Sequence, residues 1–163
     1  MEKDTSSFTL VKKLKTGGKS QFVYLLENQI GAKLIKKKYS ESDPVHLQHF
    51  KNEVRILNKL KVCPFVPKIK KLKREKKTIY MNYCGDSLEL LKKEDKITKS
   101  ESFKYRKQIK RLMKELDEKW GVTRVVDGEK TYKVNFNNVC RDENGNLYLI
   151  DFGSLYWTIS GKK

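Results

Sequence analysis

The segment Asn138-Val-Cys-Arg-Asp-Glu-Asn-Gly-Asn-Leu-Tyr-Leu-Ile-Asp-Phe-Gly153 decides the fold of this chain. Two short strand-like runs, 139–141 and 147–150, are separated by the turn-forming residues 142–146. Because Asn-Gly tolerates the positive φ of tight turns, the pattern predicts an antiparallel hairpin. Antiparallel pairing brings Asn138 and Asp151 side by side at the open end of the hairpin. Such oxygen ligands suit Mg²⁺ bound to a polyphosphate.

The end of this segment, Asp151-Phe152-Gly153, resembles the magnesium-binding Asp-Phe-Gly motif of the eukaryotic-type protein kinase family. Asn138 lies thirteen positions upstream, where that family has its second metal-binding asparagine. The resemblance implies that the chain binds ATP, with Mg²⁺ held by Asn138 and Asp151.

A glycine turn separates two strands predicted at 8–14 and 21–27. It resembles the kinase turn whose backbone N–H groups face the nucleotide phosphates. Only Gly17 and Gly18 of the family's three glycines are present, and a plain hairpin is the alternative. On the resemblance, Gly17, Gly18 and Val23 belong to the nucleotide-binding set.

Residues 30–36 resemble the Val-Ala-x-Lys strand of the kinase family. The resemblance places Lys33 where the family has the lysine that contacts the α- and β-phosphates. A helix is predicted to begin at Asp43-Pro44, an N-cap residue followed by proline at the first helical position. This helix carries Glu53, which the resemblance pairs with Lys33. An exposed lysine and a solvated glutamate are the alternative.

Residues 69–75 and 78–83 are predicted to form a second strand pair. The strand at 79–85 resembles the one that leads into the adenine-binding hinge of kinases. Met81 would then lie behind the purine ring. The backbone of Asn82, Tyr83 and Cys84 would offer hydrogen bonds to the edge of the base.

The fold class expected on this basis is α+β, in the two-lobed arrangement of protein kinases. An antiparallel sheet with one helix would form the N-lobe, about residues 1–83, and a truncated helical C-lobe would follow at about 84–163. Within the second part, residues 100–120 predict an amphipathic helix and residues 122–134 a small hairpin. The 163 residues form a single domain on this reading, ending just after Asp-Phe-Gly. In this respect the chain resembles minimal kinases of large DNA viruses and bacterial effectors.

The catalytic loop departs from the family pattern. Lys133 stands five residues before Asn138, where the family has its catalytic aspartate. A protonated lysine cannot accept the proton of a substrate hydroxyl, although it can neutralise charge near the γ-phosphate. Loss of a general base typically costs about a hundred- to ten-thousand-fold in rate.

Two functions are therefore favoured over a third, a basic interaction module for nucleic acid in which the motif residues are structural remnants. The first is a minimal ATP-dependent Ser/Thr phosphotransferase that uses Lys33, Glu53, Asp151 and Lys133. The second is a catalytically inactive pseudokinase that acts by binding a host protein or another kinase. In either case a protein partner is expected to replace the missing part of the C-lobe.

The composition sets further bounds. The formal net charge is +17, and only six of the 37 basic residues are arginine. A lysine-rich surface of compositional origin is favoured over a nucleic-acid interface, since nucleic-acid readers prefer arginine for bidentate contacts. Three scattered cysteines form no disulfide framework or zinc motif, which suits reduced thiols in a cytoplasmic compartment, that of the host cell for a viral or effector protein. No apolar run is long enough for a membrane span.

Overall fold

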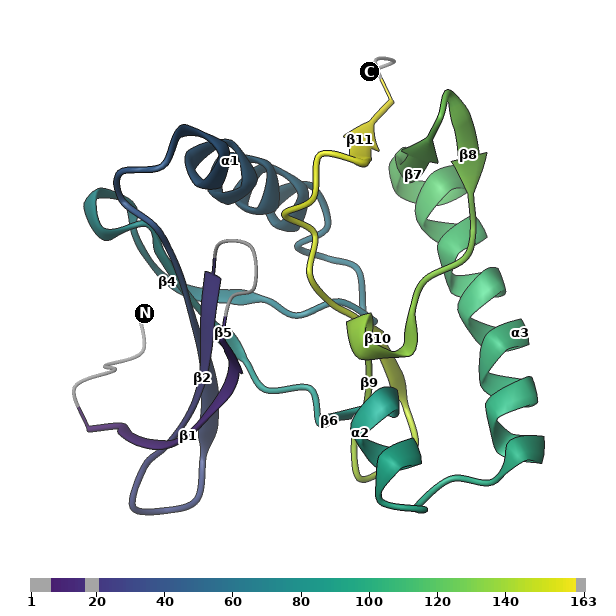
Figure 1. Ribbon diagram of the computed structural model, residues 1–163, viewed down its shortest axis with the longest axis horizontal. Coiled ribbons are helices and arrows are strands. Elements are labelled where there is room, and N and C mark those ends of the chain that lie inside the picture. The colour runs from purple at the N-terminus through teal and green to yellow at the C-terminus, as the bar shows by residue number, and fades with distance from the viewer. Residues whose placement is uncertain (1–6, 17–20, 161–163) are drawn as a thin grey trace.

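The computed structural model describes residues 7–16 and 21–160, which form a mixed α+β structure (Figure 1). The glycine turn at Gly17 and Gly18 lies outside the described residues. The described elements, in chain order, are β1 (Thr9–Thr16), β2 (Gln21–Glu27), β3 (Lys33–Tyr39), α1 (Pro44–Lys59), β4 (Ile69–Lys73), the 3-10 turn η1 (Arg74–Lys76), β5 (Thr78–Asn82), β6 (Asp86–Ser87), α2 (Leu88–Lys93), α3 (Lys99–Glu115), the π-helical turn η2 (Leu116–Trp120), β7 (Val122–Val126), β8 (Glu129–Thr131), the 3-10 turn η3 (Phe136–Asn138), β9 (Val139–Arg141), β10 (Leu147–Leu149) and β11 (Trp157–Ile159).

The N-terminal half forms a five-stranded antiparallel sheet in the order β1-β2-β3-β5-β4. In Figure 1 the helices α1, α2 and α3 all lie to one side of this sheet. Since successive side chains of a strand point to opposite faces, each strand has one inner face toward the helices and one outer face.

The strand predicted at 30–36 lies three residues further along the chain. The side-chain oxygen of Asn28 accepts hydrogen bonds from the backbone N–H groups of Ile30 and Ala32, at 3.1 and 2.9 Å. Gly31, with φ +86°, completes this turn. Because the turn uses residues 28–32, β3 begins only at Lys33.

The predicted helix α1 is confirmed, including its first turn. Asp43 is the N-cap, and its carboxylate accepts a hydrogen bond from Val45 N–H at 2.9 Å, with Pro44 at the first helical position. The helix buries Phe50, Val54 and Leu57 and packs against the inner face of the sheet.

The C-terminal half consists of α2, α3 and two small three-stranded sheets. Thr98 and Glu101 form a capping box at the start of α3, and the following π-helical turn ends at Gly121 with φ +68°. Beyond it, β7 pairs with β8 as predicted, and also with β11, a strand that the sequence pattern did not predict.

The hairpin predicted from Asn138–Gly153 is present as β9 and β10. The two-residue strand β6 adds to its edge, so that Ser87 lies opposite Cys140. Gly85 allows this approach, because a Cβ atom there would lie 2.0 Å from the carbonyl oxygen of Arg141. The hairpin is thereby joined to the segment that leaves the five-stranded sheet.

One buried core connects the two halves of the molecule. It contains apolar side chains of α1, β5, α2, α3, β9 and β10, together with Phe152 and Trp157. Phe152 is fully buried, and the centre of its ring lies 4.7 Å from the centre of the Trp157 ring. Among the described helices, none has the length and apolar character that a membrane crossing needs.

Candidate functional site

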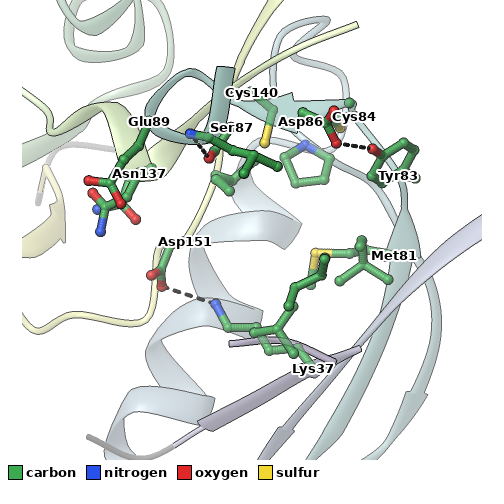
Figure 2. Close-up of a pocket in the computed structure, with 18 of the residues that line it drawn as sticks. Lys37, Met81, Tyr83, Cys84, Asp86, Ser87, Glu89, Asn137, Cys140 and Asp151 are labelled. Atoms are coloured by element: carbon green, nitrogen blue, oxygen red, sulfur yellow. Dashed lines mark hydrogen bonds and ion pairs between the residues drawn. The ribbon is translucent and has the colours of Figure 1, made fainter. Parts of the chain in front are cut away.

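A cavity of about 380 Å³ lies between the inner face of the five-stranded sheet and the β9–β10 hairpin (Figure 2). A cavity of this size falls in the range typical of small-molecule sites. Side chains of β2, β3 and β5 line one wall, and α2, η3 and the residues after β10 line the other.

The wall formed by β3 carries a buried lysine, Lys37. Its ammonium lies 2.7 Å from a carboxylate oxygen of Glu53 and 3.0 Å from one of Asp151. Burial disfavours the charged ammonium, but Asp151 and Glu53 outweigh it and raise the pKa of Lys37. In Figure 2 the side chains of Lys37 and Asp151 point toward each other across the cavity. A protonated lysine is therefore held between two carboxylates from distant segments.

The prediction that Lys33 would pair with Glu53 is wrong, because Lys37 occupies that place. Lys33 is the first residue of β3, is exposed, and lies opposite Glu27 in the sheet. Its ammonium lies 5.4 Å from the centre of the Tyr83 ring. At about 3.3 Å per residue, Lys33 and Lys37 are roughly 13 Å apart along the strand.

Glu53, on α1, is 1% exposed and has three partners in the site. One carboxylate oxygen accepts from the Tyr39 hydroxyl and from Lys37. The other accepts from the backbone N–H of Phe152 at 3.2 Å. Burial, followed by the nearby charges of Glu53 and Asp151, raises the pKa of Tyr39 well above its ordinary value. Glu53 thus fixes the position of β3 relative to the segment 151–153.

Asp151 follows the hairpin in a left-handed backbone conformation, with φ +68°. A non-glycine residue in this region carries a cost of roughly 1 kcal/mol or more, and such strain is common at functional sites. The preceding residue, Ile150, donates its N–H to the carbonyl oxygen of Asn138 at 3.0 Å. This bond closes the end of the hairpin and brings Asn138 and Asp151 together, as expected from the sequence.

Two amide oxygens at the cavity have no hydrogen-bond partner in the described part of the chain. The side-chain oxygens of Asn137 and Asn138 are buried and accept no hydrogen bond from any described residue. Buried polar atoms are normally satisfied, so both oxygens are suited to a ligand or cation. The described residues contain no cluster of three or more His, Cys, Asp or Glu that could hold a metal. An Mg²⁺ ion at Asn138 and Asp151 would therefore take its remaining oxygens from phosphate and water.

The far end of the cavity is apolar. Met81 is 5% exposed and lies opposite Ile35 in the sheet, and Val23, which lies opposite Lys37, also lines the cavity. The backbone N–H of Asn82 donates to the Lys68 carbonyl at 3.2 Å, which anchors the end of β5. The next residue, Tyr83, donates its hydroxyl hydrogen to Asp86 at 2.8 Å (Figure 2).

The two cysteines at this end are not reactive thiolates. Burial raises the pKa of Cys84 and of Cys140 to about 12. Both side chains line the cavity as neutral, weakly polar groups.

Lys133 does not line this cavity. It is exposed, in the connection between β8 and η3, and its N–H donates to the Thr131 hydroxyl at 3.3 Å. A carboxylate that the sequence pattern did not single out, Glu89 of α2, lies in the cavity wall instead. Figure 2 shows Glu89 beside Asn137, on the same side of the cavity as Asp151.

Most of the residues predicted for the site line this cavity, among them Glu53, Met81, Cys84, Asn138 and Asp151. Val23, Asn82 and Tyr83 also line it, whereas Lys33 and Lys133 do not. Lys37 was missed because the resemblance of residues 30–36 to the kinase strand assigned the role to Lys33. The sequence also does not show which of the consecutive lysines Lys36, Lys37 and Lys38 faces inward. The register of β3 on β2 and β5 decides it.

No protein-family model and no curated protein matches the chain. The chemistry of the site therefore has to be argued from its own geometry. A buried ammonium, a partly exposed carboxylate and two unpartnered amide oxygens converge at one end of an apolar cavity. This combination can bind a molecule that has a flat apolar part and a metal-bound anionic part.

Proposed function

We propose that the protein binds ATP with Mg²⁺ in this cavity, as a minimal protein kinase-like domain of two lobes. The observation that carries the proposal is the buried arrangement of Lys37 between Glu53 and Asp151. A lysine held in this way presents its positive charge at a fixed point of the cavity wall. Paired residues of this kind orient the phosphates of the nucleotide in protein kinases.

The nucleotide would lie with its base between Val23 and Met81 at the apolar end of the cavity. The backbone of residues 82–84 would contact the edge of the base. Lys37 would contact the phosphates while Glu53 keeps it in place. When bound, Mg²⁺ would neutralise phosphate charge, with Asn138 and Asp151 as its protein ligands. The unpartnered oxygen of Asn138 supports this assignment.

Phosphoryl transfer to a protein hydroxyl is the activity that this arrangement would support. Positioning and charge neutralisation supply most of the catalysis of such reactions. The position expected for the catalytic base is taken by the exposed Lys133, so transfer would be slow. The same observation favours the second candidate, a pseudokinase that binds nucleotide and acts through a protein partner.

Thermal unfolding of the full chain with and without Mg-ATP tests nucleotide binding, because a ligand of the native state raises the apparent Tm. We expect Mg-ATP to raise the Tm of the wild type and of Lys33→Met. It should leave the Tm of Lys37→Met unchanged. If both variants responded as the wild type does, the assignment of Lys37 would be wrong.

Incubation with γ-labelled ATP and casein as acceptor separates the two candidates. Label transfer that is lost in Asp151→Asn would indicate a phosphotransferase. If Mg-ATP raised the Tm of the wild type but no label were transferred, the protein would be a pseudokinase.

A further inference from the structure

The outer face of the five-stranded sheet carries a row of alternating lysine and tyrosine side chains. Lys13 of β1 lies opposite Tyr24 of β2, which lies opposite Lys36 of β3. Lys36 lies opposite Tyr80 of β5, which lies opposite Lys71 of β4. Directly opposed residues of antiparallel strands project from the same face. The row therefore crosses all five strands, on the face turned away from the cavity, since Ile35 and Lys37 line the cavity.

The lysines of this face contact its aromatic rings. The ammonium of Lys36 lies 5.9 Å from the centre of the Tyr24 ring and 6.0 Å from that of Tyr80. Lys13 lies 4.4 Å from the centre of the Phe22 ring. The rings of Phe22 and Tyr24 are stacked, with an interplanar angle of 24°, and Phe22 is 42% exposed. Phe22 is thus presented to solvent between lysines, with the half-buried ring of Tyr24 nearly parallel to it.

Positive charge on this face is poorly compensated. Burial and then the repulsion of Lys38, Lys73 and Lys76 lower the pKa of Lys36. Lys38 forms an ion pair with Glu41 at 3.7 Å, between two exposed side chains. Such a pair is weak in water, so the face keeps an excess of positive charge.

We propose that this lysine–aromatic face binds single-stranded nucleic acid. Its accessible residues are Lys13, Phe22, Tyr24, Lys36, Lys38, Lys71 and Lys73, whereas Tyr80 is 7% exposed and lies beneath Lys36 and Lys73. Lysines neutralise phosphates without regard to sequence, and exposed rings stack on unpaired bases. A single strand laid over β1, β2 and β3 would place its bases on Phe22 and Tyr24 and its phosphates near the lysines beside them. A duplex keeps its bases stacked on one another and cannot use Phe22 and Tyr24.

The face and the cavity lie on opposite sides of the same sheet, so this binding is independent of the proposed nucleotide site. Successive residues of β3 serve the two sides, Lys36 the outer face and Lys37 the cavity. Loss of one activity would leave the other in place.

Fluorescence anisotropy of labelled 20-nucleotide oligothymidylate and oligouridylate, with the full chain, tests the proposal. We expect Phe22→Leu to weaken binding roughly tenfold, the loss of about one stacked base. The matched control is Phe103→Leu on α3, because Phe103 is also exposed and lies under a lysine, Lys107, at 4.7 Å. It should bind as the wild type does.

A second comparison tests the charge of the face, with two double variants that have the same net charge as each other. Lys13→Gln/Lys36→Gln should reduce the slope of log affinity against log salt by about 0.7 for each lysine removed. The control Lys104→Gln/Lys107→Gln removes the same charge from α3 and should leave the slope unchanged. Equal losses in both pairs would show that binding is diffuse and would overturn the proposal.

Two further measurements complete the test. Asn138→Ala, a cavity substitution expected to leave the Tm nearly unchanged, should bind the oligonucleotides as the wild type does, which would show independence from the cavity. A 20-base-pair duplex and phosphatidylserine vesicles should bind more weakly than the single strands. Tighter binding to either, or a Phe22→Leu variant that melts as the wild type does and keeps full affinity, would refute the assignment.

Discussion

Lys37 and Asp151 are 114 residues apart in the sequence, and their side chains meet at 3.0 Å. Glu53 of α1 contacts the same ammonium at 2.7 Å. Three segments of the chain therefore meet at one buried charge cluster, so the stability of the fold and the chemistry of the cavity depend on the same residues.

Removal of the Lys37 ammonium should destabilise the protein. In Lys37→Met, Glu53 stays buried without its cation, and breaking a buried pair typically costs about 3 kcal/mol or more. Urea unfolding should show this loss, whereas Lys33→Met, at an exposed position of the same strand, should change the unfolding free energy by less than about 0.5 kcal/mol. Equal effects of the two substitutions would contradict the register of β3.

Stability should fall at alkaline pH. The folded-state pKa values of Tyr39 and Lys37 are both raised, so the folded state holds protons that the unfolded chain releases above about pH 10. The stabilisation is complete below that pH and is lost as the pH rises toward the folded-state pKa values. Urea unfolding between pH 8 and 11.5 should show a decline that is shallower in Tyr39→Phe. A decline of the same slope in both proteins would exclude Tyr39 as a contributor.

Gly153 and Tyr39 should be energetically coupled. A Cβ atom at Gly153 would lie 2.4 Å from the Tyr39 hydroxyl oxygen and 3.3 Å from the carbonyl oxygen of His49. Gly153→Ala should therefore cost about 1–3 kcal/mol, as overpacking does.

The same substitution in a Tyr39→Phe background should cost less, because the closest atom is gone. Coupling of roughly 1 kcal/mol is expected from a double-mutant cycle by urea unfolding. Additive effects would show that the clash with the hydroxyl is not the cause.

The amide oxygen of Asn138 should matter for magnesium and not for folding. It has no partner among the described residues, so Asn138→Ala should leave the Tm of the free protein nearly unchanged. The rise in Tm with Mg-ATP should become smaller in this variant. The rise with ATP in EDTA should stay as in the wild type.

Asn137→Ala is the control, since the amide oxygen of Asn137 is also buried and has no partner within residues 7–16 and 21–160. If Asn137→Ala removed the magnesium-dependent rise in Tm and Asn138→Ala kept it, the metal ligand would be Asn137 and not Asn138.

Local signals in the sequence were sufficient for several elements. Asp43-Pro44 begins α1, and Asn144-Gly145 lies in the turn of the β9–β10 hairpin. These features depend on caps, turn residues and periodicity, which act over a few residues. The strands β6 and β11 were not predicted, because two- and three-residue strands exist only through their pairing with β9 and β7.

By itself the sequence determined the hairpin that brings Asn138 and Asp151 together, and the helix that carries Glu53. Only the tertiary structure decided that Lys37, and not Lys33, meets Glu53 and Asp151. The turn at Asn28 makes β3 begin at Lys33, and the pairing of β3 with β2 and β5 places Lys37 on the inner face. The same pairing places lysines and tyrosines of five strands in one row on the outer face, which no single strand reveals. Cross-strand register is a property of the assembled sheet, since it depends on segments that meet only after folding.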